Sequence, residues 1–231
     1  MRWLVIPKST RLQLIVNAAA YIAVDRAEEE HDLASRINAD APGVLAEVVE
    51  ALGALLVHYS TDYVFDGSGD APWQEADTPG PVNHYGASKL AGERRIQDSG
   101  CRHLIFRTSW VYAARGSNFL ATMARLMRER DALQVIDDQV GAPTGAELIA
   151  DVTAHAIRQT LSDSSKQGLY NLAAGGETSW LGHARHASAQ LPARYQQAGK
   201  RLRSNHASLA ARGKPSTCRT QVFPRRKQTM T

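Results

Sequence analysis

The sequence predicts an α/β fold in which helices cover both faces of a parallel sheet. Apolar, strand-like runs at 14–20, 55–59 and 104–108 alternate with segments of helical periodicity, and this alternation is typical of parallel sheets. The chain has 231 residues, of which 43% are apolar. This is enough to form one α/β domain of moderate size.

The first half of the chain contains the clearest element boundaries. The strand-like run at 14–20 ends in the small residues Ala18, Ala19 and Ala20, where a flat ligand can approach the backbone. Asp40-Ala-Pro42 is interpreted as the N-terminal cap of a helix with proline in its first turn. Apolar residues recur at helical spacing from 44 to 52, Gly53 can end this helix, and 55–59 forms the next strand.

The second half continues the alternation. Residues 66–81 are rich in Gly, Pro and Asp and are predicted to form a loop beside the site. Helices are expected over 85–98, 119–130 and 146–161, the last after a turn at 141–145, and strands over 104–108 and 169–173. Asn83 and His84 are expected to position the start of the helix that follows them.

Tyr85 and Lys89 are four residues apart and therefore lie one helical turn apart on one face. A nearby cation stabilises a phenolate and lowers the tyrosine pKa from its ordinary value of ~10. A hydroxyl from Ser60 or Thr61 can then share the oxygen that is being protonated, as general acid catalysis at a carbonyl requires. The alternative for this pair is an amphipathic surface helix with a half-buried tyrosine.

Five stretches together give the chain a specific resemblance. They are VNAAAYIAVDRAEEE at 16–30, VHYSTDYVFDGSGDAPWQEAD at 57–77, NHYGASKLAGE at 83–93, LIFRTSWVYA at 104–113 and DDQVGAPTGAELIADVTAHAIR at 137–158. Through them the chain closely resembles the dTDP-4-dehydrorhamnose reductase family, a branch of the extended short-chain dehydrogenases/reductases, over residues 11–182. The resemblance implies a Rossmann-like sheet and a reaction in which NADPH or NADH reduces the C4 keto group of a dTDP-linked deoxysugar to give dTDP-L-rhamnose.

The resemblance also implies a role for each matching residue. Tyr85 would donate the proton, Lys89 would lower the Tyr85 pKa and bind the nicotinamide ribose, and Thr61 would orient the sugar oxygen. The other implied cofactor contacts are Ala18, Ala19, Ala20, Tyr21 and Tyr59. Asp62 and Trp110 match substrate-side positions, and their alternatives are a loop-capping aspartate and a core tryptophan.

Both ends depart from the family pattern. The first glycine is Gly43, so no Gly-rich pyrophosphate loop precedes Asn17, and by comparison with the family about forty residues of the cofactor half are missing. We therefore expect a partial, incomplete Rossmann-like domain over 1–182 that lacks the first cofactor-binding βαβ unit. Residues 183–231 are expected to form a largely irregular, disordered basic tail, which a shifted reading frame or a gene remnant would explain.

The charge is concentrated in that tail. The 54 residues from Thr178 onward contain eleven Lys/Arg and no Asp or Glu, whereas residues 1–177 sum to −7. A basic arm can bind nucleic acid electrostatically, but the scarcity of aromatic residues after Trp180 argues against that function. No apolar run approaches the eighteen residues of a membrane span.

The remaining side chains bear on compartment and metals. Cys101 and Cys218 show no metal spacing. One lies in the family-like body and the other in the tail, so a disulfide framework is not expected and a reducing cytoplasm is. Glu147 matches a carboxylate of a family magnesium site at a homodimer contact, but a single carboxylate makes no site, and helix capping is the favoured role. No metal is therefore predicted. A non-catalytic binding or regulatory protein, or a pseudogene product, is the alternative to the reductase.

Overall fold

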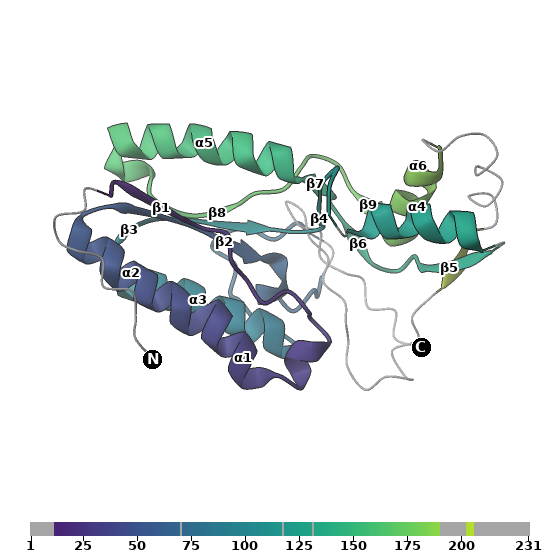
Figure 1. The fold of residues 1–231 in the computed structure, drawn as a ribbon, viewed down its shortest axis with the longest axis horizontal. Helices are drawn as coiled ribbons and strands as arrows, with labels where there is room; N and C mark the ends of the chain where they lie inside the picture. Colours follow the sequence, from purple (N-terminus) through teal and green to yellow (C-terminus); the bar gives the residue numbers. More distant parts are fainter. Residues whose placement is uncertain (1–11, 70, 117, 131, 190–201, 206–231) are drawn as a thin grey trace. The chain divides into compact units, whose positions relative to one another are not determined.

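The computed structural model describes residues 12–69, 71–116, 118–130, 132–189 and 202–205 (Figure 1). These residues belong to two compact units. The first unit comprises residues up to Phe65, Thr78–Arg107 and Thr153–Asn171, and the second comprises Asp66–Asp77, Thr108–Val152 and the residues from Leu172 onward. The two units are described separately below.

The first unit is built on a four-stranded sheet in the order β1-β2-β3-β8. Its strands are β1 (Leu14–Asn17), β2 (Leu55–Thr61), β3 (Arg102–Thr108) and β8 (Gly168–Asn171). β1 runs parallel to β2, with Leu14 opposite Leu55, and β3 runs parallel to β8, with Leu104 opposite Gly168. The α/β class with a Rossmann-like parallel sheet is thus confirmed.

Helices cover both faces of this sheet (Figure 1). On one face lie α1 (His31–Ser35), α2 (Ala41–Leu52) and α3 (His84–Asp98), and on the other lies α5 (Ala146–Ser162). The helices at 84–98 and 146–162 match their predicted ranges within one residue. Buried apolar side chains fill the space between α2, α3 and the sheet, among them Ala46, Val49, Leu56, Ile96 and Ile105.

The predicted helix cap at Asp40 is wrong. Asp40 has helical dihedral angles and makes no side-chain capping bond, because a π-helical turn at Arg36–Asp40 joins α1 to α2 without a break. Pro42 lacks the N–H that would donate to the carbonyl of Asn38, four residues earlier in the helix. That carbonyl faces α3, where a methyl group added to Gly92 would lie 2.1 Å from it.

Among the described residues of the second unit are the helices α4 (Phe119–Glu129) and α6 (Trp180–Ala189) and three pairs of short strands. β4 (Val111–Tyr112) runs parallel to β7 (Thr144–Gly145), β5 (Leu133–Ile136) parallel to β10 (Leu202–Asn205), and β6 (Val140–Gly141) antiparallel to β9 (Thr178–Ser179). A separate core joins α4, α6, β5 and β10, with Met127, Leu133, Leu181 and Leu202 among its buried residues.

The predicted boundary at residue 182 falls inside α6, which continues to Ala189. Within the predicted tail, Leu202–Asn205 form the strand β10, and the rest of 190–231 lies outside the described residues. Cys218 and most of the basic arm that was considered for nucleic-acid binding therefore also lie outside them. None of the helices in the described part of the chain combines the length and apolarity that a bilayer crossing requires.

Candidate active site

The candidate site lies in the first unit, where β2 ends and α3 begins. β2 leads into a 3₁₀ turn at Asp62–Val64, and the first turn of α3 packs tightly on it, since a methyl group on Gly86 would lie 2.1 Å from the Tyr63 carbonyl oxygen. Asn83 caps α3 by accepting a hydrogen bond from the Gly86 N–H at 2.8 Å, which confirms its predicted role. The Asn83 cap and the close Gly86–Tyr63 contact together fix the orientation of the first turn of α3.

Tyr85 and Lys89 follow this cap on one face of α3. The Tyr85 ring is partly buried and packs edge-on against the Tyr63 ring, with centroids 5.4 Å apart. Lys89 is 1% exposed, and its Nζ donates to the Tyr59 carbonyl at 2.6 Å and lies 3.3 Å from His58 Nε2. The ammonium of the proposed pair is therefore held against the carboxyl end of β2.

Burial controls the electrostatics of this lysine. It lowers the pKa of Lys89 to about 8 because the low-dielectric surroundings disfavour the charged form, while the nearby Glu93 carboxylate opposes the shift. Burial and the Lys89 charge also hold the pKa of His58 well below its usual range. His58 is therefore neutral, and Lys89 titrates near physiological pH.

This titration predicts a pH-dependent stability. Between the folded pKa of about 8 and the ordinary value of 10.5, the unfolded chain holds a proton that the folded chain has lost, so stability rises with pH. At 1.36 kcal/mol per pKa unit, the free energy of unfolding of the wild type relative to Lys89→Met should increase by up to ~3 kcal/mol from about pH 7.5 to pH 10.5. Urea denaturation across this range measures the difference, and parallel pH curves for the two proteins would refute the burial effect.

The two hydroxyls at the end of β2 have different surroundings. The Thr61 hydroxyl donates to Asp62 Oδ1 at 2.9 Å and accepts from the Tyr63 N–H at 3.2 Å. The Ser60 hydroxyl is buried and has no hydrogen-bond partner among the described residues. The Thr61 hydroxyl proton is thus used by Asp62. The second lone pair of the Thr61 oxygen can still accept a hydrogen bond from a hydroxyl group.

The small-residue strip after β1 presents its backbone openly. Ala18 and Ala19 are exposed. The Asn38 side chain fixes Tyr21, accepting from its N–H at 2.8 Å and donating to its carbonyl at 3.1 Å. Sequence reasoning missed Asn38 because it lies in the middle of a helical segment and has no motif around it. Tyr59, the other predicted cofactor contact, donates through its hydroxyl to Thr153 at 3.0 Å.

Trp110 belongs to the second unit and is described within it. Its backbone φ is 48°, a left-handed value that is rare for a bulky residue. The indole stacks on Trp180 with centroids 3.5 Å apart, and a methyl group on Gly141 would lie 2.5 Å from the indole. One face of the ring is thus covered by Trp180, Gly141 lies close to the indole, and the predicted sugar contact stays a prediction.

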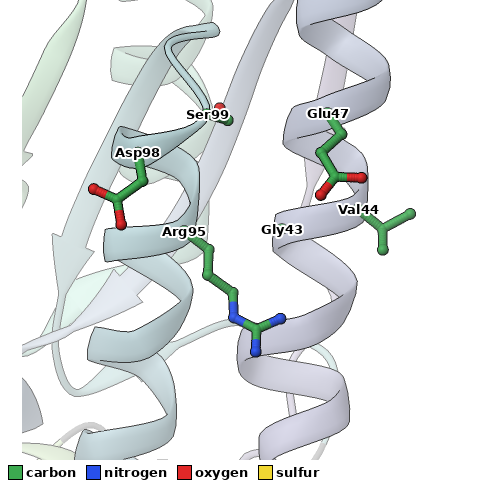
Figure 2. A pocket seen from close by; sticks show the side chains of 6 residues that line it. All are labelled: Gly43, Val44, Glu47, Arg95, Asp98 and Ser99. Atoms are coloured by element: carbon green, nitrogen blue, oxygen red, sulfur yellow. The ribbon is translucent and has the colours of Figure 1, made fainter.

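Glu147 is in the first turn of α5, where its charge interacts favourably with the helix dipole. In the described ranges no three His, Cys, Asp or Glu side chains come together as a metal site requires. A surface cleft of about 390 Å³ is lined by Gly43, Val44, Glu47, Arg95, Asp98 and Ser99 (Figure 2). It lies beside the far end of α3 from Tyr85.

The sequence is similar to those of proteins named dTDP-4-dehydrorhamnose reductase. The chain is 56% identical over 177 residues to the dTDP-4-dehydrorhamnose reductase of Salmonella typhimurium, covering 77% of this chain and 59% of that relative. The Sinorhizobium fredii enzyme of the same name is 43% identical over 175 residues, covering 75% of this chain and 59% of its own length. The chain thus spans less than two thirds of these relatives.

Solved structures with a similar fold carry the same enzyme name as these relatives. The dTDP-4-dehydrorhamnose reductase of Bacillus anthracis in complex with NADP superposes with a TM-score of 0.75 at 36% identity, covering 85% of this chain and 67% of that one. The Clostridium acetobutylicum protein gives the same TM-score at 35% identity, covering 84% and 65%. The family model described as the RmlD substrate binding domain matches residues 5–229, and the chain belongs to that family.

Proposed function

We propose that this chain provides the proton-donating part of a reductase that uses NADPH or NADH to reduce the C4 keto group of dTDP-4-dehydro-L-rhamnose. The observation that carries the proposal is the Tyr85–Lys89 pair, with Lys89 buried against the carboxyl end of β2 and Thr61 at the end of that strand. Relatives that share this part of the chain are named dTDP-4-dehydrorhamnose reductase.

The residues after β1 fit a flat nicotinamide nucleotide. Ala18 and Ala19 leave the main chain exposed, so a planar ring can approach it without meeting a long side chain. Ala20 and Tyr21 continue this strip, and Tyr59 and Lys89 lie at the end of the neighbouring strand and on α3. When bound, a reduced nicotinamide supplies the hydride for the reduction.

The side chains of this site handle the proton. Tyr85 donates its hydroxyl proton to the carbonyl oxygen of the sugar, and the resulting phenolate is stabilised by the Lys89 cation one turn away. Once that oxygen is protonated, the new sugar hydroxyl can donate a hydrogen bond to the Thr61 hydroxyl oxygen. Asp62 accepts the Thr61 proton and so keeps that hydroxyl in a fixed orientation. Solvent then returns a proton to Tyr85.

The proposal includes a dTDP-linked sugar as the substrate and the cytoplasm as the compartment, because the reaction draws on the nicotinamide and sugar-nucleotide pools found there. A homodimer, which the resemblance implies, stays a prediction. So do Asp62 and Trp110 as substrate contacts.

Cofactor titration tests this function directly. Adding NADPH or NADH to the full chain, with nucleotide fluorescence as the signal, should give a dissociation constant in the micromolar range that is typical of enzyme ligands. Lys89→Met should bind more weakly, because the amine proposed to contact the ribose is lost. Absence of binding up to about millimolar nucleotide would contradict the reductase and favour the non-catalytic alternative.

A further inference from the structure

A row of three buried polar side chains extends from β1 to α3 through β2. Asn17 is 8% exposed, His58 is fully buried and Lys89 is 1% exposed. Asn17 Nδ2 lies 3.0 Å from His58 Nδ1, and His58 Nε2 lies 3.3 Å from Lys89 Nζ. The proposed proton transfer uses Lys89 but assigns nothing to His58 or Asn17.

The hydrogen-bond donors decide which nitrogen of His58 carries its proton. The Ala19 N–H, which can only donate, points to Asn17 Oδ1 at 3.1 Å and so fixes the orientation of the amide. The amide NH₂ therefore faces His58 Nδ1, which must accept. Because His58 is neutral, its single proton lies on Nε2 and points toward Lys89.

The position of the His58 proton on Nε2 affects the charge of Lys89. An ammonium group has three donors and no lone pair, so it cannot accept the His58 Nε2–H. A neutral amine accepts it and still donates to the Tyr59 carbonyl. We propose that His58, oriented by Asn17, is a positioning residue that holds Lys89 in place and disfavours its charged form in the ligand-free protein.

The proposal rests on the proposed function, since Lys89 is the cation of that site. To become an ammonium, Lys89 takes one proton from solvent. His58 keeps its one proton but moves it to Nδ1, and the Asn17 amide reverses to accept it. The Ala19 N–H then loses its partner and becomes free for a ligand. Binding along the strip at Ala19 and charging of Lys89 are therefore coupled.

Other charged groups around Lys89 act in known directions. Glu93, one turn later on α3, favours the ammonium, but its charge is shared with Arg107 of β3. Tyr85 lies one turn earlier on the same helix. From β2 the facing groups are His58 and the Tyr59 carbonyl, and from β1 the uncharged Asn17 contacts His58. His58 is thus the neighbour that can exchange its donor and acceptor nitrogens without a change in its own charge.

Nitrogen NMR of the full, ligand-free chain tests the first step. With ¹⁵N-labelled histidine, the His58 resonances, assigned by their loss in His58→Phe, should show the Nε2–H tautomer at neutral pH. The Lys89 side-chain signal, assigned among six lysines by its loss in Lys89→Met, should titrate at or below about 8. An Nδ1–H tautomer of His58 in the wild-type protein overturns the proposal.

Asn17→Asp tests the coupling with nearly unchanged shape. A carboxylate facing Nδ1 must accept, so the proton moves to Nδ1, Nε2 becomes the acceptor, and the Lys89 pKa should rise by about 2. In an Asn17→Asp/His58→Phe double variant only the through-space charge remains, and the rise should be less than half as large. An equal rise in both backgrounds overturns the relay through His58.

These measurements use neither cofactor nor turnover. A chain that binds no NADPH would refute the proposed function and leave the tautomer and the Lys89 pKa to be judged separately. Conversely, a chain that binds NADPH and carries the Nδ1–H tautomer keeps its function and loses this inference.

Discussion

Replacing Tyr85 by phenylalanine should lower kcat for the proposed reduction of dTDP-4-dehydrorhamnose by ~10²–10⁴, because general acids in this role contribute about that much to the rate. The change removes one hydroxyl and leaves the ring, so the edge-on packing against Tyr63 is kept. The dissociation constant for NADPH and the free energy of unfolding should change little. Steady-state oxidation of NADPH at 340 nm, together with the nucleotide titration, measures both parts of this expectation.

Tyr170→Phe is the matched control for this substitution. Tyr170 lies on β8, away from α3, and its hydroxyl donates to the Lys166 carbonyl at 2.8 Å. Loss of this hydroxyl should therefore leave turnover unchanged. If Tyr85→Phe also keeps turnover within about threefold of the wild type, the proton comes from another group. The buried Ser60 hydroxyl would then be the next residue to replace.

Much of the fold was predictable because local signals and tertiary structure agree. Gly53 adopts the left-handed conformation that ends α2, with φ of 63°, and Asn83 caps α3 as its position before the helix suggested. The apolar runs predicted at 14–20, 55–59 and 104–108 contain strands of one sheet, and β2 and most of β3 are buried in it. In each case the chemistry of a residue and its immediate neighbours determines the element.

The environment of the site was less predictable because it depends on contacts between distant segments. Asn17, His58 and Lys89 come from three elements, and no spacing in the sequence indicates that they form one row. Asp40 carried a reasonable capping signal, but the helix continues through it and its carboxylate pairs with Arg95 on α3 instead. A tertiary partner decided the role of this residue, and local propensity did not.

Replacing Glu93 by glutamine should lower the free energy of unfolding by roughly 3–5 kcal/mol, because it leaves a buried guanidinium without its counter-ion. Glu93 is 1% exposed and Arg107 is 3% exposed, and three contacts of 2.7, 3.0 and 3.2 Å join them. Arg107 also lies over the Phe65 ring at 5.0 Å. Since domains are stable by only about 5–15 kcal/mol, urea denaturation will detect this loss easily.

Two further variants separate the buried charge from other causes. Asp40→Asn breaks the Arg95 pair, which has a similar 2.8 Å contact but is about half exposed, so its cost should stay below about 1 kcal/mol. Glu93→Leu/Arg107→Met removes both buried charges, including an Arg107 Nη1 that has no partner among the described residues, and should recover most of the stability. A cost for Glu93→Gln equal to that of Asp40→Asn would show that the pair is solvated.

The same carboxylate connects stability to the site. Glu93 lies one turn after Lys89 on α3 and raises the Lys89 pKa against the effect of burial. Glu93→Gln should therefore move the Lys89 pKa further below about 8, so that less of the ammonium is available to stabilise the Tyr85 phenolate. A titration of the Lys89 side chain in this variant measures the shift. An unchanged Lys89 pKa would mean that Arg107 already cancels the Glu93 charge at that distance, and the ion pair would then serve the fold alone.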